Sequence, residues 1–512
     1  MTFRSTTVLD TVKTLLLLLT LLAFPLLASG RTLQVGQGGE YANLQAAAAV
    51  AQPGDSILFK TGTHAGGQYV EGLQGRADAW ITIIGEEEGG AVVRGGSNAW
   101  QLTDAAYLRI VGISFGGQTG NGLNLDDGGS YDTPAHHIII ERCTWLDINA
   151  TGNNDLLKMS GIDSFQVRDC TFQNGAAGGS MIDMVGCHQG SFLRNRFQNA
   201  GSNCIQAKGG TSDIRIEGNT FVEGGARAIN IGGSTGLQFF RPLGINYESA
   251  RIKVYSNVFV GADAAVAFVG TVNSEVVNNT IYLPKRWAAR ILQETTDAAF
   301  LQCGDNVFRN NLVVVGNVAA NPTFNIGGNT RPGTFTFNNN LWFNAENGSW
   351  NGPNLPAAES NGIISRDPLL TAPPSDFTLR AASPAIGAGL AVDQPTHDYN
   401  GRPFLTNRSI GAVEGGSSTT SVAAASQPET ELQCEVIATS NHVAAAVQLS
   451  RSGPVEFSLY DVRGEAIWRH HAQLPSGQTT LQLPLDESPI GFYLLVVQFG
   501  SRVVVKEVGV SQ

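Results

Sequence analysis

Ionisable and amide side chains recur at one position of four successive short segments, about 24 residues apart. They are Lys158, Asp183, Gln206 and Asn230. The residues directly before them, and the one before Ala267 in a fifth segment, are expected to face the core: Leu157, Ile182, Ile205, Ile229 and Val266. A lysine amine can accept a proton in catalysis, and carboxylate oxygens are the ligands that Ca²⁺ prefers. The spacing therefore predicts a row of polar groups able to bind or transform a ligand.

A second polar row flanks the first, three residues earlier in each segment. It consists of Asp155, Ser180, Asn203 and Arg227. Lys208 follows Gln206 by two residues and faces the same way if the segment is a strand, because strand side chains alternate between two faces. Acidic, basic and amide groups then share one surface. The alternative is an ordinary solvated face whose charges pair with one another.

A repeat of about 25 residues supplies the elements that position these rows. Its marker is Asn or Cys, then any residue, then an aromatic or aliphatic residue, and a short alternating run precedes each marker. The markers begin at Cys143, Cys170, Asn195, Asn219, Asn257, Asn279, Asn311 and Asn340. No helical apolar period is present here. The repeat predicts a parallel β-solenoid with turns about 4.8 Å apart and an Asn ladder inside one bend.

Composition excludes several classes of protein. The chain has 512 residues and a net charge of −11, which argues against nucleic-acid binding because phosphate contact needs clustered Lys and Arg. Charged residues make up 15% and Gly occupies 61 positions, which disfavours helical bundles and charge-rich disorder. Six cysteines are too few for a disulfide scaffold, and none forms a CxxC metal-binding pair, so most are expected to be buried thiols.

Residues 1–30 have the pattern of a secretory signal peptide. Arg4 and Lys13 precede an apolar run from Leu15 to Leu27, and small residues follow it. The run is shorter than the roughly 20 residues that a membrane span needs, although a membrane anchor is the alternative. We expect an exported protein with no transmembrane span in the mature chain.

Both ends of the repeat region carry further motifs. The opening segment, residues 41–63, combines an Ala-rich stretch with Pro53-Gly54-Asp55, and the closing motifs lie at residues 367–370, 383–389 and 401–414. On these motifs residues 31–415 resemble the right-handed parallel β-helix proteins of the pectate-lyase-like superfamily. The resemblance implies an all-β solenoid whose first coil is covered by a short N-terminal helix and whose last motifs form closing coils.

The C-terminal part of the chain reads as a separate module. Residues 416–430 have the composition of a flexible linker, and residues 431–512 alternate like the strands of a small β-sandwich. The segments 459–464 and 491–494 and the strand around Lys506 resemble the C-terminal sorting domain of the type IX secretion system. The resemblance implies type IX machinery as a partner and a secreted or outer-membrane-surface location in a bacterium. A carbohydrate-binding sandwich is the alternative.

The pectate-lyase-like resemblance implies an enzyme that acts on an acidic polysaccharide, most commonly by β-elimination beside a uronic acid. That reaction needs a base at the C5 proton and a group that neutralises the carboxylate. Under this hypothesis Lys208 is the base, Lys158 is the second choice, and Arg227 clamps the carboxylate. Asp155 and Asp183 are expected Ca²⁺ ligands. We expect a monomer without a nucleic-acid partner.

Two non-repeat insertions, residues 238–247 and 283–294, carry aromatic and arginine side chains that suit sugar rings and uronate carboxylates. Plain surface packing is the alternative for Phe240 and Trp287. His188 is expected in a turn that lines the groove, with a structural role as the alternative. The expected substrate-binding residues are Gln206, Asn203, Asn230, His188, Arg241, Trp287 and Arg290.

Two other functions remain open at this point. A glycoside hydrolase on the same fold would use paired carboxylates. Asp126-Asp127 and Arg251-Ile-Lys253 match fragments of polygalacturonase motifs, but the rest of those motifs is missing. A non-catalytic glycan-binding or adhesin-like surface protein is the third possibility. Only a lyase would release an unsaturated product.

Overall fold

The computed structural model describes residues 30–130, 132–415, 432–438, 442–449, 452–461, 466–484, 491–499 and 502–510. Two compact units, Met1–Ser418 and Thr419–Gln512, make up the chain, and each is described by itself. The expected signal peptide, the expected linker and residues 462–464 of the sorting-domain motif lie outside the described residues.

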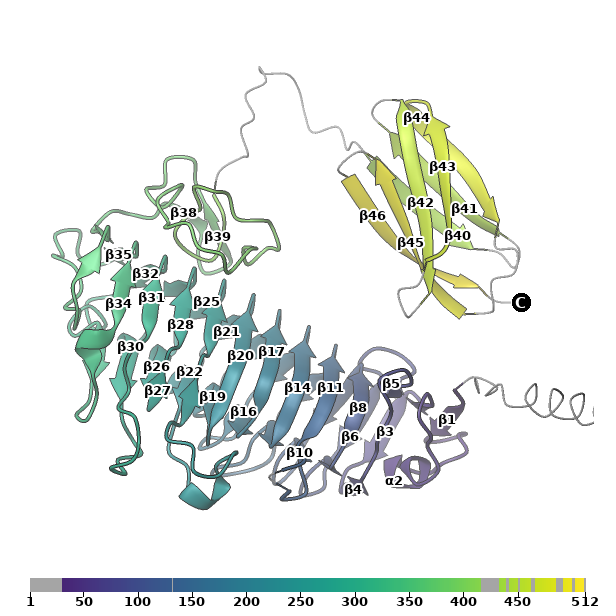
Figure 1. Cartoon of the computed structure of the whole chain (residues 1–512), viewed down its shortest axis with the longest axis horizontal. Coiled ribbons are helices and arrows are strands. Elements are labelled where there is room, and N and C mark those ends of the chain that lie inside the picture. Colours follow the sequence, from purple (N-terminus) through teal and green to yellow (C-terminus); the bar gives the residue numbers. More distant parts are fainter. Residues whose placement is uncertain are drawn as a thin grey trace, which may run out of the picture. The chain divides into compact units, whose positions relative to one another are not determined.

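The first unit is a parallel β-solenoid built from three sheets, which confirms the fold class (Figure 1). Sheet A consists of β1 (Thr32–Val35), β2 (Ser56–Phe59), β5 (Ile81–Gly85), β8 (Ala106–Val111), β11 (Ala135–Glu141), β14 (Ile162–Arg168), β17 (His188–Leu193), β20 (Thr211–Glu217), β23 (Ser249–Ala250), β24 (Lys253–Tyr255), β27 (Thr271–Val272), β28 (Glu275–Val277), β31 (Val307–Arg309), β34 (Thr336–Asn338) and β36 (Glu359–Ser360). Sheet B consists of β3 (Gly62–Ala65), β6 (Ala91–Arg94), β9 (Ile113–Gly116), β12 (Thr144–Leu146), β15 (Thr171–Gln173), β18 (Arg196–Gln198), β21 (Thr220–Val222), β25 (Val258–Val260), β29 (Thr280–Tyr282), β32 (Leu312–Val315), β35 (Leu341–Asn344) and β37 (Ile363–Ile364). Sheet C consists of β4 (Gln68–Glu71), β7 (Trp100–Thr103), β10 (Leu123–Asp126), β13 (Leu157–Ser160), β16 (Ser180–Val185), β19 (Asn203–Lys208), β22 (Arg227–Gly232), β26 (Ala264–Val269), β30 (Trp287–Leu292) and β33 (Phe324–Ile326).

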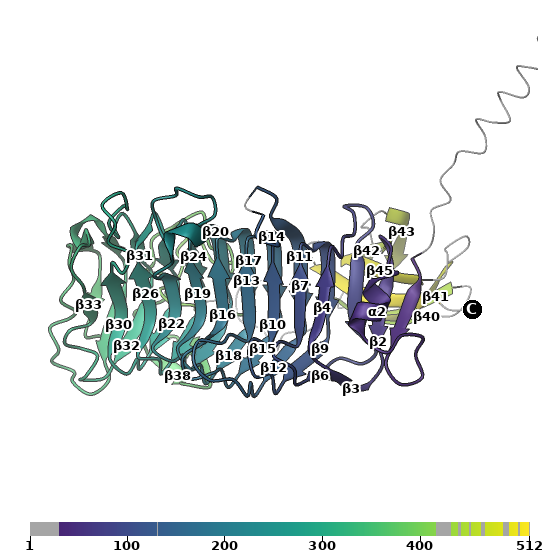
Figure 2. The same ribbon diagram turned by 90° about the horizontal axis from the view of Figure 1, so that it is seen from below.

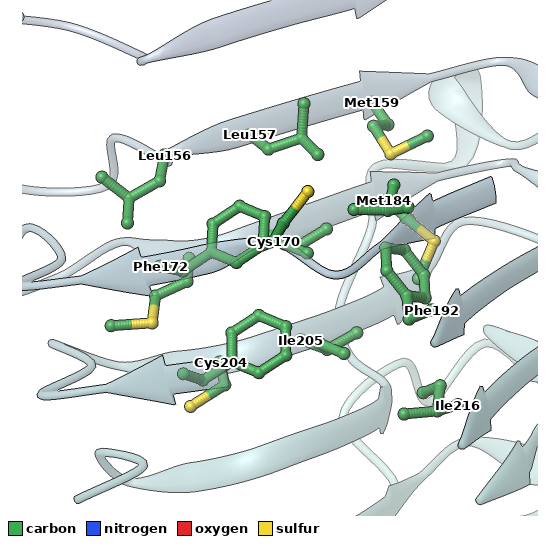
Figure 3. Close-up of a cluster of buried hydrophobic side chains, with 14 of the residues drawn as sticks. Leu156, Leu157, Met159, Cys170, Phe172, Met184, Phe192, Cys204, Ile205 and Ile216 are labelled. Atoms are coloured by element: carbon green, nitrogen blue, oxygen red, sulfur yellow. The ribbon is translucent and has the colours of Figure 1, made fainter. Parts of the chain in front are cut away.

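One coil of the solenoid runs from a strand of sheet C through sheet A to sheet B. Alternate side chains of each strand fill the interior, as strand geometry requires. The five aliphatic residues expected to face the core are all fully buried, and Figure 3 shows Leu157 and Ile205 among the packed side chains. Like side chains stack on successive coils: the rings of Phe197 and Phe221 are 4.9 Å apart and nearly parallel. This spacing is that of neighbouring strands.

The bend between sheets A and B holds the expected Asn ladder. The side-chain oxygen of Asn219 accepts two hydrogen bonds from Asn195, one from its backbone N–H (2.8 Å) and one from its side-chain Nδ2 (3.0 Å). Nδ2 of Asn219 in turn donates to the carbonyl of Phe192 (3.0 Å). The same pattern continues through Asn257 and Asn279. Each Asn therefore satisfies backbone groups that no strand can reach.

Cysteine occupies the ladder position in the two earliest coils with a marker. Cys143 and Cys170 are buried, and so are Cys187, Cys204 and Cys303. All five are free thiols, as the sequence led us to expect.

The expected covering helix is present but short. Helix α2 (Leu44–Ala48) begins after Asn43, whose side chain accepts a hydrogen bond from Ala46 N–H. Leu44 and Ala47 are buried, and the helix lies against the first strands (Figure 1). It shields apolar surface at the open end of the solenoid. Two single-turn 3₁₀ helices, η1 (Leu237–Phe239) and η2 (Pro332–Thr334), lie in loops.

The expectation of closing coils is wrong. In the described residues no strand after β37 joins the three sheets; β38 (Leu370–Ala372) and β39 (Asp376–Leu379) pair with each other, and residues 380–415 are irregular. This segment folds back over sheet B (Figure 1). Leu312 and Val314 on the outer face of sheet B are apolar and pack in one cluster with Ile410 and Ala412. The segment thus buries the apolar outer face of sheet B. Additional coils would have extended the solenoid without covering this face.

The second unit contains two antiparallel sheets that share a core, in agreement with the predicted sandwich. One sheet consists of β40 (Leu432–Ala438), β41 (His442–Leu449) and β44 (Gly477–Pro484). The other consists of β43 (Ala466–Leu474), β42 (Gly453–Asp461), β45 (Gly491–Phe499) and β46 (Arg502–Val510). Val447 of the first sheet and Phe457 of the second lie in the same buried cluster. Among the residues described in either unit, no helix has the length and apolar character needed to cross a membrane.

Candidate functional site

The first polar row predicted from the sequence exists on the outer face of sheet C. Lys158 pairs in register with Asp183, Asp183 with Gln206, and Gln206 with Asn230. These four residues, which we call the central column, lie on neighbouring strands along the solenoid (Figure 2). Three members of the flanking row are also in register, because Asn203 pairs with both Ser180 and Arg227. Asp155 lies two residues before β13.

Two lysines enclose the carboxylate of Asp183 at the centre of this column. Lys158 Nζ donates a hydrogen bond to Asp183 Oδ2, and Lys208 Nζ lies 3.2 Å from Oδ1. The second contact is an ion pair without hydrogen-bond geometry. The Asp183 side chain is 1% exposed, whereas those of Lys158 and Lys208 are 22% and 14% exposed. A ligand on this face therefore meets the amines rather than the carboxylate beneath them.

Asp155 adds a second buried carboxylate. Its Oδ2 lies 3.6 Å from Lys158 Nζ, and its Oδ1 accepts a hydrogen bond from Ser180 N–H (2.8 Å). Burial and the nearby charge of Asp183 raise the pKa of Asp155 to about 6. Burial alone would lower the pKa of Lys158, but the two carboxylates outweigh it and raise this pKa above its usual value. Lys158 is therefore held as an ammonium ion.

The two carboxylates do not fit the expected Ca²⁺ site. A cation needs several oxygen ligands around one point. Here the ammonium of Lys158 already stands between Asp155 and Asp183 and contacts both. In the part of the chain that the structure describes, no three His, Cys, Asp or Glu side chains gather as a metal site.

Amide and hydroxyl groups connect the two rows beside this centre. Asn203 Nδ2 donates to Ser180 Oγ (3.1 Å), and Ser180 Oγ donates to Gln206 Oε1 (3.2 Å). Asn203 and Asn230 are buried, and Gln206 is half-buried. Of these three expected substrate-binding residues, Gln206 is thus the accessible one.

The structure corrects the position of Trp287 and Arg290. Half of the expected insertion at residues 283–294 is a regular strand, β30, and the extra length follows it in residues 293–306. Arg290 pairs with Ala267 and so belongs to the line of the central column, while Trp287 continues the flanking row. The sequence analysis took this segment for an insertion because β30 lacks the polar pattern of the earlier sheet C strands.

Arginines gather around Trp287. The guanidinium carbons of Arg286 and Arg290 lie 4.2 and 4.7 Å from the centre of its ring. Arg227 donates to Asn230 Oδ1 (3.1 Å) and to Glu294 Oε1 (2.7 Å). Trp287 therefore orients cations, a different contact from the expected stacking on a sugar ring.

The central column also extends toward the N-terminus, which the sequence analysis missed. Asn124 pairs with Lys158, and Gln101 pairs with Asn124. Nδ2 of Asn124 donates to Gln101 Oε1 (2.7 Å) and to Asp126 Oδ2 (3.2 Å). Tyr69, one strand further, is 47% exposed. These strands precede the first Cys marker, so the marker repeat gave no signal for them.

Arg241 lies at the corner between sheets C and A, and its guanidinium is paired with a buried carboxylate. Its guanidinium forms a two-point hydrogen bond with Asp127, with Nη2 2.8 Å from Oδ1, and 11% of its side chain is exposed. A Cβ atom at Gly186 would lie 2.4 Å from Arg241 Cβ, and one at Gly161 would lie 2.0 Å from Asp127 Oδ2. Glycine at both corners therefore lets Arg241 reach back across several coils.

His188 lies on the sheet A side of the same corner. It begins β17, pairs with Asp163 across strands, and its Nδ1 is 2.8 Å from Asp163 Oδ1. Burial opposes the charged ring, but Asp163 outweighs this effect and raises the pKa of His188. His188 and Arg241 line a cavity of about 380 Å³ that includes no residue of the central column. Lys208 is not among the residues that line this cavity, although the backbone N–H of Arg241 donates to the carbonyl of Gly209, the next residue in the chain (3.1 Å).

Glu248, which the sequence analysis missed, connects the segment after β22 and the segment after β30 to the backbone just after Lys208. Its carboxylate accepts hydrogen bonds from Gly209 N–H (3.0 Å), from Thr235 N–H (2.9 Å) and Oγ1 (2.8 Å), and from Thr295 Oγ1. Glu248 is fully buried. Phe240, in the first insertion, is also buried and contacts Phe300 in the second, which supports packing as its role.

Comparison with known proteins shows similarity in architecture. No protein-family model and no curated protein matches the chain. Pectate lyase Pel9A is similar over 76% of this chain and 98% of its own, at 15% identity and a TM-score of 0.46. The PL6 family polysaccharide lyase Pedsa3628 from Pseudopedobacter saltans is similar over 75% and 99%, at 14% identity and a TM-score of 0.40. The catalytic unit of the GH87 α-1,3-glucanase from Streptomyces thermodiastaticus is similar over 62% and 65%, at 15% identity and a TM-score of 0.37. At these values the similarity says nothing about the reaction, which must be argued from the residues of sheet C.

Proposed function

We propose that this protein cleaves a uronic-acid-containing polysaccharide by β-elimination on the outer face of sheet C. The observation that carries the proposal is the state of the two central lysines. Lys158 is hydrogen-bonded to the buried Asp183, whereas the Lys208 amine, 3.2 Å from the same carboxylate, makes no hydrogen bond within the described residues. Both amines are accessible, but Lys208 is the less constrained of the two, and in its neutral form it can accept a proton from a substrate.

The elimination assigns a task to each of the accessible groups. Lys208, in its neutral amine form, takes the proton from C5. The electron pair left behind forms the C4=C5 double bond, and the C4–O glycosidic bond breaks as the leaving oxygen takes up a proton from water. Negative charge develops on the uronate as the C5 proton leaves. The ammonium of Lys158 places positive charge on the same face, where it stabilises that transition state.

A screen of uronate polymers tests the proposal. Full-length protein is incubated with polygalacturonate, alginate and other acidic polysaccharides, and unsaturated products are followed by ultraviolet absorbance. We expect one acidic polymer to give the unsaturated product, and we expect a chelator to leave the rate unchanged because Lys158 occupies the position between the carboxylates. New reducing ends without ultraviolet absorbance would show hydrolysis instead. No degradation of any polymer would leave glycan binding as the function.

The structure favours elimination over hydrolysis on this face. A glycosidase needs two carboxyl groups that flank the scissile bond. Asp155 and Asp183 are 2% and 1% exposed, and both contact Lys158. Neither is placed to protonate a leaving group or to attack a sugar from the solvent side.

We propose further that a bacterium exports the chain through type IX secretion, with residues 431–512 as the sorting domain. The apolar run from Leu15 to Leu27 and the sandwich strands that include Lys506 support this proposal. The test fuses residues 1–30 and 431–512 to the two ends of a fluorescent reporter in a bacterium with that system. The reporter is expected in the medium or on the cell surface, and retention inside the cell would contradict the proposal.

A further inference from the structure

The polar face of sheet C contains one coil at which both rows carry alanine. Ala267 stands between Asn230 and Arg290, and Ala264 precedes Trp287 in the flanking row. Both alanines are fully buried although their side chains end at Cβ. Longer side chains from the neighbouring strands must therefore reach over this coil.

The pair of Arg227 and Glu294 reaches over the alanine coil. Arg227 begins β22, on one side of β26, and Glu294 follows β30, on the other side. Their charged groups meet at 2.7 Å. Both side chains remain accessible, at 17% and 34% exposed, so solvent or a ligand can compete for this contact.

Arg290 brings a second guanidinium to the same place. Its Nε donates to Asn325 Oδ1 (2.9 Å), and no carboxylate of the described residues lies within ion-pair distance of it. Arg227 begins β22 and Arg290 lies in β30, on either side of the Ala267 strand. Burial and the positive charge of Arg227 lower the pKa of Arg290. Its contact with the Trp287 ring fixes its position. Glu294 therefore pairs with Arg227, while Arg290 has no carboxylate partner of its own among the described residues.

We infer that Arg227 and Arg290 form an anion-binding subsite over the Ala267 coil, and that Glu294 occupies the place of a sugar carboxylate until an acidic polysaccharide displaces it. The inference rests on the proposed function for its ligand, a uronate unit of the bound chain. Lys208 lies on β19 and Arg290 on β30, three strands apart or about 14 Å along the solenoid. The subsite thus holds a sugar several units away from the bond that is cleaved.

The inference predicts opposite effects for two neighbouring residues. Binding is measured by calorimetry in the Lys208→Ala background, so that the polymer stays intact, with polygalacturonate and alginate as probes and highly methyl-esterified polygalacturonate as the ligand control. Arg290→Ala is expected to weaken binding of one acidic polymer by about tenfold or more, the effect of losing a hydrogen bond to a charged group. Glu294→Gln is expected to tighten binding several-fold because it removes the competing carboxylate. The esterified polymer is expected to respond to neither change.

Matched controls separate this subsite from a general charge effect. Arg194→Ala and Glu223→Gln each remove one charge from exposed ion pairs, with Asp169 and with Lys285, outside sheet C. We expect them to leave binding unchanged, and we expect Arg290→Lys to restore part of the affinity. Three outcomes would each overturn the inference. The controls could show effects as large as those at Arg290 and Glu294, Glu294→Gln could bind more weakly than its parent, or neither acidic polymer could bind. Because binding is the readout, failure of the elimination assay alone would contradict the proposed reaction and leave the subsite standing.

Discussion

The two lysines around Asp183 have different contacts, and substitutions at the two positions should differ accordingly. Lys208→Ala removes an ion pair without hydrogen-bond geometry and leaves Asp183 paired with Lys158, so we expect loss of unsaturated product with an unchanged thermal melt. Lys158→Ala leaves the buried Asp183 without its hydrogen-bonded cation and should lower the free energy of unfolding by about 3 kcal/mol. Enzyme assays and denaturant unfolding measure the two effects. An active Lys208→Ala variant would exclude Lys208 as the base.

Asp155 should make stability depend on pH between about 4 and 6. Its pKa rises from 3.8 to about 6 on folding because it is buried beside Asp183. The folded protein therefore binds a proton that the unfolded chain releases, and this stabilisation is complete below pH 4 and lost as the pH rises through about 6. The melting temperature of the wild type relative to Asp155→Asn is expected to fall across this range. A constant difference between the two proteins would show that Asp155 does not titrate there.

At the scale of elements, Glu248 connects one strand end with two insertions. Glu248→Ala leaves a buried donor at Gly209 and part-buried donors at Thr235 and Thr295 without their acceptor, so we expect about 3 kcal/mol of destabilisation. Limited proteolysis should then cut the insertions faster than in the wild type. Glu223→Ala, in the exposed pair with Lys285, is the control and should change stability by less than about 1 kcal/mol. Equal cleavage rates in the wild type and Glu248→Ala would show that the insertions do not depend on Glu248.

At the scale of the whole molecule, each of the two units has its own core. The solenoid cluster runs from Leu33 to Trp342, and the sandwich cluster includes Val447 and Phe457. We therefore expect residues 30–415 alone to fold, with the strand-rich circular dichroism spectrum and the melting temperature of the solenoid in the full chain. An aggregated or unfolded fragment would show that the solenoid needs the second unit.

Local repetition made the solenoid predictable from the amino-acid sequence alone. The Asn markers and the alternating runs before them determine which side chains face inward, because each coil repeats the same contacts with the next. For this reason the register of Lys158, Asp183, Gln206 and Asn230 followed from spacing, and the structure confirmed it. Where the markers were absent, before Cys143, the continuation of the column through Asn124 and Gln101 was missed.

Contacts between distant segments required the tertiary structure. Arg241 reaches Asp127, 114 residues away, and the segment after β37 covers sheet B rather than adding coils. The burial of Asp183 beneath two lysines, and the Arg227–Glu294 contact across an alanine coil, likewise depend on how coils and insertions stack. Spacing along a chain can place a side chain on a face of a strand, but it contains no information about which distant charge will meet it there. That choice is made by packing, and it decides which polar groups remain open to a ligand.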